Sequence, residues 1–296
     1  MIYQILLGLS TGATYSLVAL GLVMIYKVTG VMNFAFGNIG MFFVYVAFWF
    51  ITMNLNIYLG IFLSFVLAAT TGYLLERFAL RPIRHLSHAS MLIVTFGFLM
   101  ILEDLSIQLW GTDYKKFPEL ISGRPYVFRG DFGILVLRRQ DVLIYIVSLF
   151  TIVFLILLLN KTKLGIAIKA VSENEEVASY MGINVGGIFS FSWIFRTLMA
   201  VIVGVLVALN TFVSPSMLVF YQLEGFTAVV LGGFESFKGA VLGGLLLGVI
   251  ENMVGKYISN DLKSTFSLLL IIIVLLFFPN GIFGIRKSEK LRKRLC

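Results

Sequence analysis

The chain of 296 residues is 59% hydrophobic and only 13% charged, and its mean hydropathy is +0.98. These values lie outside the range of soluble globular domains and indicate a membrane protein. The formal net charge of +8 comes from basic loops and a basic tail, which membrane topology explains without any nucleic acid. The one cysteine is the last residue, Cys296, so no intrachain disulfide can form.

Long uncharged intervals near the N-terminus predict membrane-spanning helices. No charged residue occurs before Lys27 or between Lys27 and Glu76, and the second interval can hold two spans of about 20 residues each. Because the alternation typical of a barrel does not occur, helices are the spanning structure that we expect. The predicted spans lie near residues 2–26, 33–53, 57–75, 89–110, 142–160, 188–211, 225–235, 239–258 and 265–279.

The fold class that follows is all-α: a polytopic transmembrane helix bundle, in a single transmembrane domain over residues 1–296. Segment 225–235 is too short to cross the hydrocarbon alone, so the bundle has eight or nine spans, and we favour nine. With nine spans and a cytoplasmic C-terminus the N-terminus lies outside, whereas eight would place both ends inside.

Uncharged polar residues inside the spans are candidates for a translocation path. Hydroxyls and amides can line a path without carrying a charge, and three of the candidates share one face of the first helix. The alternative for each is a hydrogen bond between helices, worth about 0.6 kcal/mol in a bundle. The candidates are Thr11, Thr14, Tyr15, Asn33, Asn38, Thr95 and Thr227.

Basic residues beside the spans predict the side on which each loop lies, because cytoplasmic loops carry an excess of Lys and Arg. Basic residues between the third and fourth spans, in loop 161–187 and in the tail 285–296 place these segments in the cytoplasm. Loop 111–141 is then extracytoplasmic, although it contains six basic residues of its own. Its part Gly123–Arg139 has apolar runs separated by glycines, which is typical of a small hairpin.

Loop 161–187 contains the signals of a short helix over Glu173–Met181, about 13 Å long. Ser172 and Glu175 have capping-box spacing, and Gly182 followed by Ile183 is a C-terminal stop. Asn174, Ala178 and Met181 recur along one side of this helix. Its acidic first turn disfavours an anionic lipid surface and favours docking into a groove on another protein, although a merely structural segment remains possible.

The stretch Phe226–Glu251 is apolar but interrupted by glycines at unusually high density. Glycine costs about 1 kcal/mol in a helix, so a simple anchor has no use for it. Four-residue spacing lets neighbouring helix backbones approach closely, and the polar segment 233–238 indicates a broken or re-entrant helix. Two ordinary spans joined by a tight turn are the alternative. The packing and hinge candidates are Gly232, Gly233, Gly239, Gly243, Gly244 and Gly248.

Arg196 lies well inside the sixth span, where a charge is costly and is a functional-site hypothesis. We expect an ion pair with Glu103, Asp104, Glu224 or Glu251, ahead of a contact with substrate. A position near a cytoplasmic water-filled vestibule is a further alternative. Glu76 and Arg77 are expected to pair at a helix end.

Catalytic and metal-binding motifs do not occur. The two histidines, His85 and His88, have no cysteine or carboxylate close by and are weak metal ligands. The phosphate-binding motif G-x-x-x-x-G-K-[ST] does not occur either. The sequence therefore predicts neither an enzyme nor a bound metal or cofactor.

Three stretches resemble the permease subunits of ATP-binding-cassette (ABC) importers for branched-chain amino acids, the LivH/LivM type. They are GLSTGATYSLVALGLVMIYKVTGVMNFAFGNIGMF (Gly8–Phe43), LGIAIKAVSENEEVASYMGINV (Leu164–Val185), and AVVLGGFESFKGAVLGGLLLGVIEN with LFFPNGIFG (Leu276–Gly284). The chain departs from the family at Phe36, where histidine is common, at Glu103 and Asp104, where an uncharged polar pair is usual, and at Arg196, where a small residue is usual.

The resemblance implies an inner-membrane protein of a bacterium or archaeon that works in a complex. Two permeases form the pore, and in this family the two are usually different, paralogous chains. A soluble amino-acid-binding protein delivers substrate from outside. Two cytoplasmic ATPase subunits bind ATP and Mg²⁺, so the hydrolysis is not carried by this chain. The Glu173–Met181 helix and the flanking Leu164–Val171 would then be the element that couples to the ATPase. The candidate coupling residues are Ser172, Glu173, Asn174, Glu175, Ala178, Met181, Gly182 and Ile183.

Other functions remain open at this point. A stand-alone ion-coupled carrier needs intramembrane carboxylates, for which only Glu103, Asp104, Glu224 and Glu251 could serve. A channel needs no cytoplasmic docking helix. Within the importer class, urea or short amides are the nearest alternative cargo.

Overall fold

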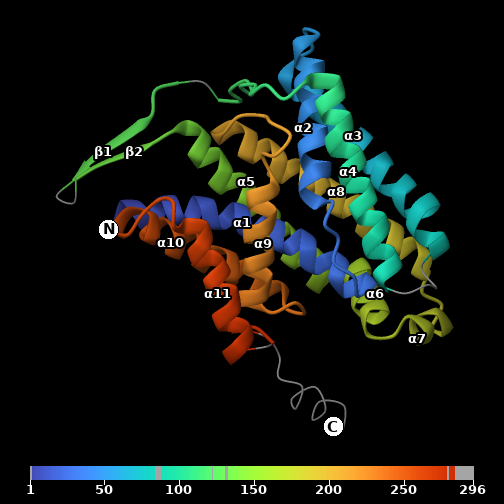
Figure 1. Ribbon diagram of the computed structural model, residues 1–296. Helices are drawn as coiled ribbons and strands as arrows, with labels where there is room; N and C mark the ends of the chain where they lie inside the picture. The colour runs from blue at the N-terminus through green and yellow to red at the C-terminus, as the bar shows by residue number, and fades with distance from the viewer. Residues whose placement is uncertain (1, 84–87, 122, 131–132, 279, 284–296) are drawn as a thin grey trace. The chain divides into compact units, whose positions relative to one another are not determined.

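The computed structural model describes residues 2–83, 88–121, 123–130, 133–278 and 280–283. Within these ranges the chain is mostly helical, with a single two-stranded sheet (Figure 1). The tail 285–296 and His85 lie outside the described residues.

Helices form at each of the nine positions that hydropathy predicts. Six helical segments of the described chain are long and apolar enough to cross a membrane, and three further apolar helices, α2, α9 and α11, are shorter. Helix α9 begins at Val219, earlier than predicted. The helices are α1 Ile2–Thr29, α2 Phe36–Thr52, α3 Ile57–Leu74, α4 His88–Trp110, α5 Arg139–Lys161, α8 Val185–Asn210, α9 Val219–Gly232, α10 Phe237–Tyr257 and α11 Lys263–Phe277.

Side-chain caps fix where several of these helices begin. Asn56 accepts a hydrogen bond from the Tyr58 amide before α3, and Asn184 accepts one from the Gly187 amide before α8. Ser236 does the same for the Gly239 amide before α10. Each cap satisfies an amide that has no partner inside its helix, which matters most where lipid rather than water surrounds the chain.

The described chain divides into two compact units, and the chain passes from one to the other inside α1, between α4 and β1, inside α5 and inside α9. Unit 1 comprises Met1–Val23, Gly123–Ile152 and Leu223–Cys296, and unit 2 comprises Met24–Ser122 and Val153–Gln222.

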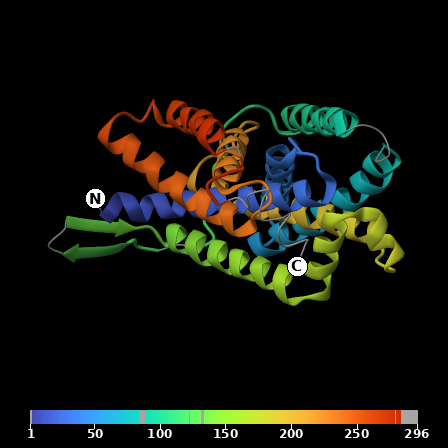
Figure 2. The ribbon, with the colours of Figure 1, turned by 90° about the horizontal axis from the view of Figure 1, so that it is seen from below.

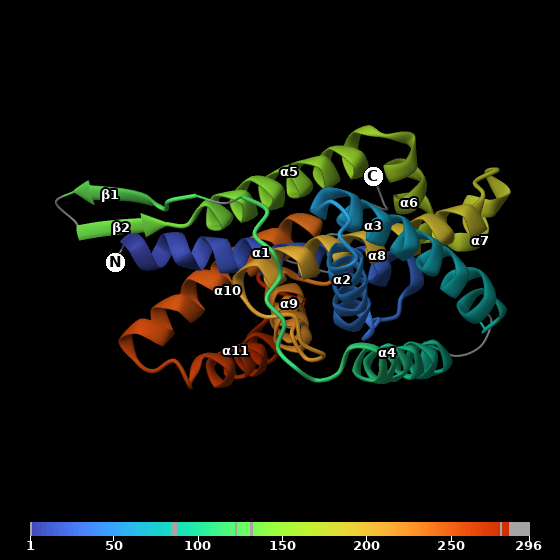
Figure 3. The same ribbon diagram turned by 90° about the horizontal axis from the view of Figure 1, so that it is seen from above.

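In unit 2, α2, α3 and α8 pack against one another, and α4 packs against α2 (Figures 1 and 3). Gly40 is required at the crossing of α2 and α8, because a Cβ atom there would lie 2.4 Å from the Ala200 carbonyl oxygen. Helix α3 ends in a π-helical turn, η1 (Leu75–Leu80), and a 3₁₀ turn, η2 (Arg81–Ile83). Pro82 lies in η2 and supplies no amide hydrogen, which helps to end the helix.

In unit 1, the first part of α1 packs along α10 with their backbones in contact. A Cβ atom at Gly248 would lie 2.3 Å from the Gly12 amide nitrogen, and one at Gly244 would lie 2.5 Å from the Ser16 hydroxyl. The Ser16 hydroxyl donates to the Val241 carbonyl across this contact at 2.8 Å. Glycines of α10 therefore sit where the backbone of α1 crosses.

The glycine-rich stretch forms two helices, α9 and α10, joined by a tight turn. Gly233 has φ +92° and begins the turn, and Ser236 caps the next helix. The two helices meet closely, since a Cβ atom at Gly239 would lie 2.0 Å from the Gly232 carbonyl and one at Gly243 would lie 2.4 Å from the Ala228 carbonyl. Helix α11 then packs against α10.

The predicted hairpin is present in unit 1 and leads directly into α5 (Figure 2). Strands β1 (Tyr126–Gly130) and β2 (Gly133–Leu137) pair in antiparallel register, with Tyr126 opposite Leu137. Arg138, just before α5, pairs with Asp141 at 2.8 Å.

The segment between α5 and α8 forms two short helices, α6 (Lys163–Glu173) and α7 (Glu175–Tyr180), which pack against α8 (Figure 3). The predicted capping box is wrong. Asn174 is extended and accepts the Val177 amide at 3.0 Å, whereas the Ser172 hydroxyl donates to the Lys169 carbonyl at 2.8 Å inside α6. Asn is as good an N-cap as Ser, and the capping residue lies two positions later than predicted.

The predicted stop after α7 is confirmed. Gly182 has φ +80°, a left-handed conformation that favours glycine. The Ile183 amide donates to the Ala178 carbonyl at 3.0 Å, and the Gly182 amide donates to the Ser179 carbonyl at 2.9 Å. This is the hydrogen-bond pattern of a Schellman motif.

Candidate functional site

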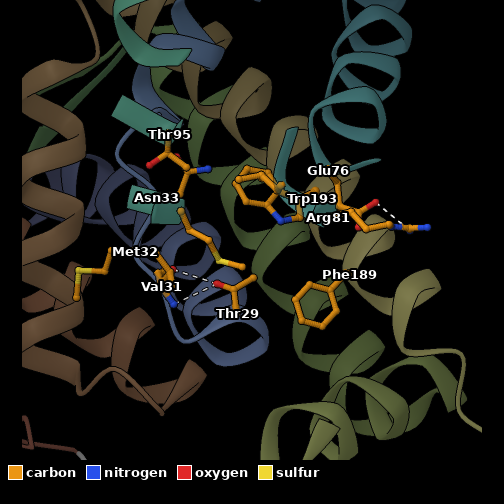
Figure 4. Close-up of a pocket in the computed structure, with 11 residues that line it drawn as sticks. Thr29, Val31, Met32, Asn33, Glu76, Arg81, Thr95, Phe189 and Trp193 are labelled. Atoms are coloured by element: carbon orange, nitrogen blue, oxygen red, sulfur yellow. Dashed lines mark hydrogen bonds and ion pairs between the residues drawn. The ribbon is translucent and has the colours of Figure 1, made fainter. Parts of the chain in front are cut away.

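Unit 2 contains a small cavity where the end of α1, the α1–α2 connection, η1, α4 and α8 meet (Figure 4). Most of its wall is apolar, with a few polar groups on two sides. Figure 4 places Trp193 between Asn33 and the pair formed by Glu76 and Arg81. The lining residues are Thr29, Val31, Met32, Asn33, Glu76, Leu80, Arg81, Met91, Thr95, Phe189 and Trp193.

The connection between α1 and α2 forms one side of the cavity and is largely shielded from the surface. Gly30 has φ +67° and ends α1, and the Asn33 side chain then accepts the Ala35 amide at 2.7 Å. Asn33 is 3% exposed. Backbone groups in such a place need internal partners, because neither lipid nor a packed core supplies any.

Gln222 supplies partners for both sides of this connection. Its Oε1 accepts the Gly37 amide at 2.6 Å, and its Nε2 donates to the Phe34 carbonyl at 2.6 Å. One side-chain amide therefore satisfies two backbone groups, in the way that a neighbouring strand would.

Glu76 forms the polar side of the cavity opposite Asn33. It is 1% exposed, and its carboxylate accepts from Arg81 Nε at 3.1 Å and from the Ser190 hydroxyl at 2.6 Å. Arg81 Nη2 also donates to the Gly186 carbonyl at 3.3 Å. Residues of η1 and η2 are thereby tied to the first turns of α8.

The expected pair of Glu76 with Arg77 is wrong. In the π-helical turn η1 residues five apart lie over one another, so Glu76 meets Arg81. Residues one apart in a helix do not face each other, and Arg77 donates instead to the Tyr73 hydroxyl.

The expected ion pair of Arg196 is also wrong. Among the described residues Arg196 forms no ion pair, although its side chain is completely buried. Its Nη2 donates to the Asn33 carbonyl at 3.2 Å. Its Cζ lies 5.1 Å from the centre of the Trp193 ring and 5.4 Å from that of Phe36, so aromatic faces and one carbonyl surround the charge in place of a carboxylate.

The carboxylates expected to pair with Arg196 have other surroundings. Glu103 Oε2 accepts from the side-chain Nδ2 of Asn38 at 3.3 Å, and Asp104 is exposed. In unit 1, Glu251 accepts from the Tyr15 hydroxyl at 2.6 Å, and Glu224 is completely buried.

The predicted path residues fall into separate groups. Asn33 and Thr95 line the cavity of unit 2, where Figure 4 shows them next to each other. Asn38 lies outside the lining, beside Glu103. The hydroxyls of Thr11, Thr14, Thr95 and Thr227 all donate to carbonyls of their own helices.

Comparison with known proteins decides the family. Residues 4–275 match the model of the family described as branched-chain amino acid transport system, permease component. The chain is 31% identical to the high-affinity branched-chain amino acid transport system permease protein LivH of Escherichia coli strain K12, over 97% of this chain and 96% of that protein. The chain belongs to this family.

More distant organisms contain similar permeases. BraD of Pseudomonas aeruginosa, named a high-affinity branched-chain amino acid transport system permease protein, is 31% identical over 97% of both chains. A probable branched-chain amino acid transport permease protein LivH of Methanocaldococcus jannaschii is 30% identical, over 94% of this permease and 91% of that protein. The apolar helices and the family together indicate a multi-pass protein of the inner membrane.

One solved structure has a similar fold. It is described as PsaBC from Streptococcus pneumoniae in complex with Fab, and it aligns with a TM-score of 0.50 over 97% of this permease and 94% of that chain. The identity is 14%, so the likeness concerns the fold alone.

Helix α7 of the permease presents an apolar surface. Tyr180 is 85% exposed, Met181 78% and Val177 54%. Ala178 is buried and faces the protein instead. The sequence placed Ala178 and Met181 on the same side of the helix, but in the structure one is buried and the other is exposed.

Sequence reasoning missed several residues of the cavity. Glu76 is the first acidic residue of the chain, which was a usable signal. Its partner Arg81 was not predictable, because a five-residue spacing has no meaning in an ordinary α-helix. Trp193 in the lining carries no local signal, and neither does Gln222, which lies outside the lining and bonds the α1–α2 connection, since both roles depend on segments far away in sequence.

Proposed function

We propose that this permease is a subunit of an ATP-driven ABC importer for branched-chain amino acids. The main support for this proposal is that the chain is 31% identical, over 97% of its length, to LivH and BraD permeases. The mostly apolar cavity with a few polar groups is consistent with a small amphipathic substrate.

The proposal includes the membrane arrangement. Residues 1–296 act as one transmembrane domain with nine membrane segments, in which α9, the turn and α10 form a broken helix. Loop 111–141 is extracytoplasmic, whereas 161–187 and the tail 285–296 are cytoplasmic. The close contacts of Gly239 and Gly248 support a role in helix packing rather than anchoring.

We infer that Ser172 to Ile183 couple transport to a separate ATPase. Exposed Tyr180, Met181 and Val177 on a helix with an acidic first turn supply a surface that suits a protein groove better than lipid. ATP and Mg²⁺ are bound by the two ATPase subunits and not by this chain. A second permease, which we expect to be a paralogue, and a soluble binding protein complete the importer.

Co-purification with an ATPase, followed by reconstitution, tests this function. The full chain is solubilised from its native membranes, co-purifying proteins are identified by mass spectrometry, and the complex is placed in proteoliposomes with the binding protein. We expect an ABC ATPase and uptake of labelled leucine that needs ATP and resists a protonophore. Uptake that a protonophore abolishes would instead show an ion-coupled carrier, and uptake of urea without leucine would show a different cargo.

Two matched substitutions separate coupling from general damage. Gly182→Pro removes the stop after α7, and Gly111→Pro does the same after α4. Both glycines have positive φ, +80° and +78°, and both have open space around the position of a Cβ atom. We expect Gly182→Pro to lose the ATPase while Gly111→Pro retains it; equal loss would contradict the coupling role.

A further inference from the structure

Arg196 has unpaired donors in a completely buried place. Of its three guanidinium nitrogens only Nη2 has an acceptor, the Asn33 carbonyl at 3.2 Å, and among the described residues neither Nε nor Nη1 has one. Within the same described ranges the Nδ2 of Asn33 is also buried without an acceptor. In the part of the chain that the structure describes, three donor nitrogens of these two residues therefore lack a partner.

Such an arrangement is unfavourable unless an anion completes it at some stage. Arginine remains charged in proteins, and a buried charge is normally paired with an opposite charge. The faces of Trp193 and Phe36 lie against the guanidinium and offset part of the desolvation. Aromatic faces cannot accept the in-plane hydrogens of Nε and Nη1, so the edge of the guanidinium stays available to an acceptor-only group such as a carboxylate.

The same two residues connect Arg196 with the cavity. Asn33 and Trp193 line the cavity (Figure 4). The Asn33 carbonyl and the Trp193 ring both contact the Arg196 guanidinium. The rest of the wall near them is aliphatic or aromatic and includes Val31, Met32 and Met91. A group of donors beside an apolar cavity fits a ligand with a carboxylate at one end and an aliphatic side chain at the other.

We propose that Arg196 and Asn33 bind the α-carboxylate of the transported amino acid, with Trp193 as the side chain that moves to admit it. The proposal rests on the proposed function, since that function supplies an aliphatic amino acid as ligand. The cavity is small, so the same movement of Trp193 also has to make room for the aliphatic side chain on the cavity side.

Trp193 also provides the probe. The chain has three tryptophans, Trp49, Trp110 and Trp193, so Trp49→Phe with Trp110→Phe leaves the fluorescence of Trp193 alone. The full chain in lipid nanodiscs is titrated with leucine, with leucinol, which lacks the carboxylate, and with sodium chloride. We expect a saturable change with leucine that is at least tenfold weaker with leucinol and does not occur with chloride.

Two substitutions decide whether Arg196 is the cause. Arg196→Met keeps much of the side-chain volume and removes the donors, and we expect it to abolish the response to leucine. Asn33→Asp keeps the oxygen that caps Ala35 and places a carboxylate beside the guanidinium. We expect Asn33→Asp to raise the melting temperature while abolishing the response, because an internal carboxylate then occupies the site.

Every outcome decides the proposal. A leucine response that persists in Arg196→Met or in Asn33→Asp would overturn it, as would chloride alone producing the full response. If Arg196→Met does not fold, Asn33→Asp carries the test. A purely structural Arg196 predicts higher stability in Asn33→Asp with an unchanged response. If ATP-driven leucine uptake is present but leucine never changes the Trp193 signal, the site is wrong and the importer function stands.

Discussion

Glu76 and Arg81 are joined by a hydrogen-bonded ion pair, with Arg81 Nε 3.1 Å from Glu76 Oε1, because the helix between them widens into a π-helical turn. The pair is asymmetric. The Glu76 side chain is 2% exposed and that of Arg81 is 40% exposed. The buried carboxylate therefore needs its partner for charge compensation, whereas water can solvate the guanidinium.

This asymmetry predicts that losing the base is worse than neutralising the acid. Arg81→Met leaves a buried carboxylate with only the Ser190 hydroxyl, and we expect it to lower the free energy of unfolding by about 1–3 kcal/mol. Glu76→Gln leaves an arginine that water can solvate, and we expect a loss of about 1 kcal/mol or less. Denaturation in detergent measures both.

The neighbouring Arg77 is the control for this pair. It lies on the same turn but bonds the Tyr73 hydroxyl at an exposed position, so Arg77→Met should change stability by no more than about 0.5 kcal/mol. A loss in Glu76→Gln that exceeds the loss in Arg81→Met would show that the buried carboxylate does not depend on its partner.

The sequence alone predicted the helices well, because hydropathy at membrane depth leaves the backbone no alternative to helical hydrogen bonding. It predicted the stop at Gly182 because a glycine followed by an apolar residue is a local signal. It failed at Ser172 because Asn174 is an equally good cap, and only the extended backbone of Asn174 decides between them.

Long-range partners were beyond prediction for a different reason. The sequence contains four acidic residues that were candidate partners for Arg196. In the structure its guanidinium instead contacts two aromatic rings and the Asn33 carbonyl. Likewise, nothing local in the sequence indicates that Gln222 bonds Phe34 and Gly37, because the connection and the glutamine are far apart in the chain.

Two glycines of unit 2 should respond oppositely to alanine. A Cβ atom at Gly40 would lie 2.4 Å from the Ala200 carbonyl, and the backbone there cannot yield without separating α2 from α8. We expect Gly40→Ala to cost about 1–3 kcal/mol of stability. Gly97 in α4 has nothing within 4 Å of the same position, so Gly97→Ala should be neutral or stabilise by about 0.5–1 kcal/mol. Thermal unfolding of the two variants side by side makes the comparison, and a destabilised Gly97→Ala would contradict it.

The cap of α7 can be tested by hydrogen exchange. Asn174→Ala removes the acceptor of the Val177 amide, which should cost about 1 kcal/mol locally and speed exchange across Glu175–Tyr180. Ser172→Ala replaces a residue inside α6 with a better helix former and should leave exchange in α7 unchanged. Mass spectrometry of peptides from this segment distinguishes the two. Faster exchange of α7 in Ser172→Ala, but not in Asn174→Ala, would show that Ser172 caps the helix after all.

Gln222 supports the α1–α2 connection because its side-chain amide bonds two partly buried backbone groups, the Gly37 amide and the Phe34 carbonyl. Gln222→Met leaves the Gly37 amide and the Phe34 carbonyl unsatisfied, which should cost about 2–4 kcal/mol. Gln222→Glu retains the acceptor for Gly37 but loses the donor for Phe34, so an intermediate loss is expected. Gln108→Met at an exposed position of α4 is the control and should have little effect. Because the connection forms one wall of the cavity, Gln222→Met should also weaken the leucine response of Trp193; a stable fold with an unchanged response would show that the cavity does not depend on this clamp.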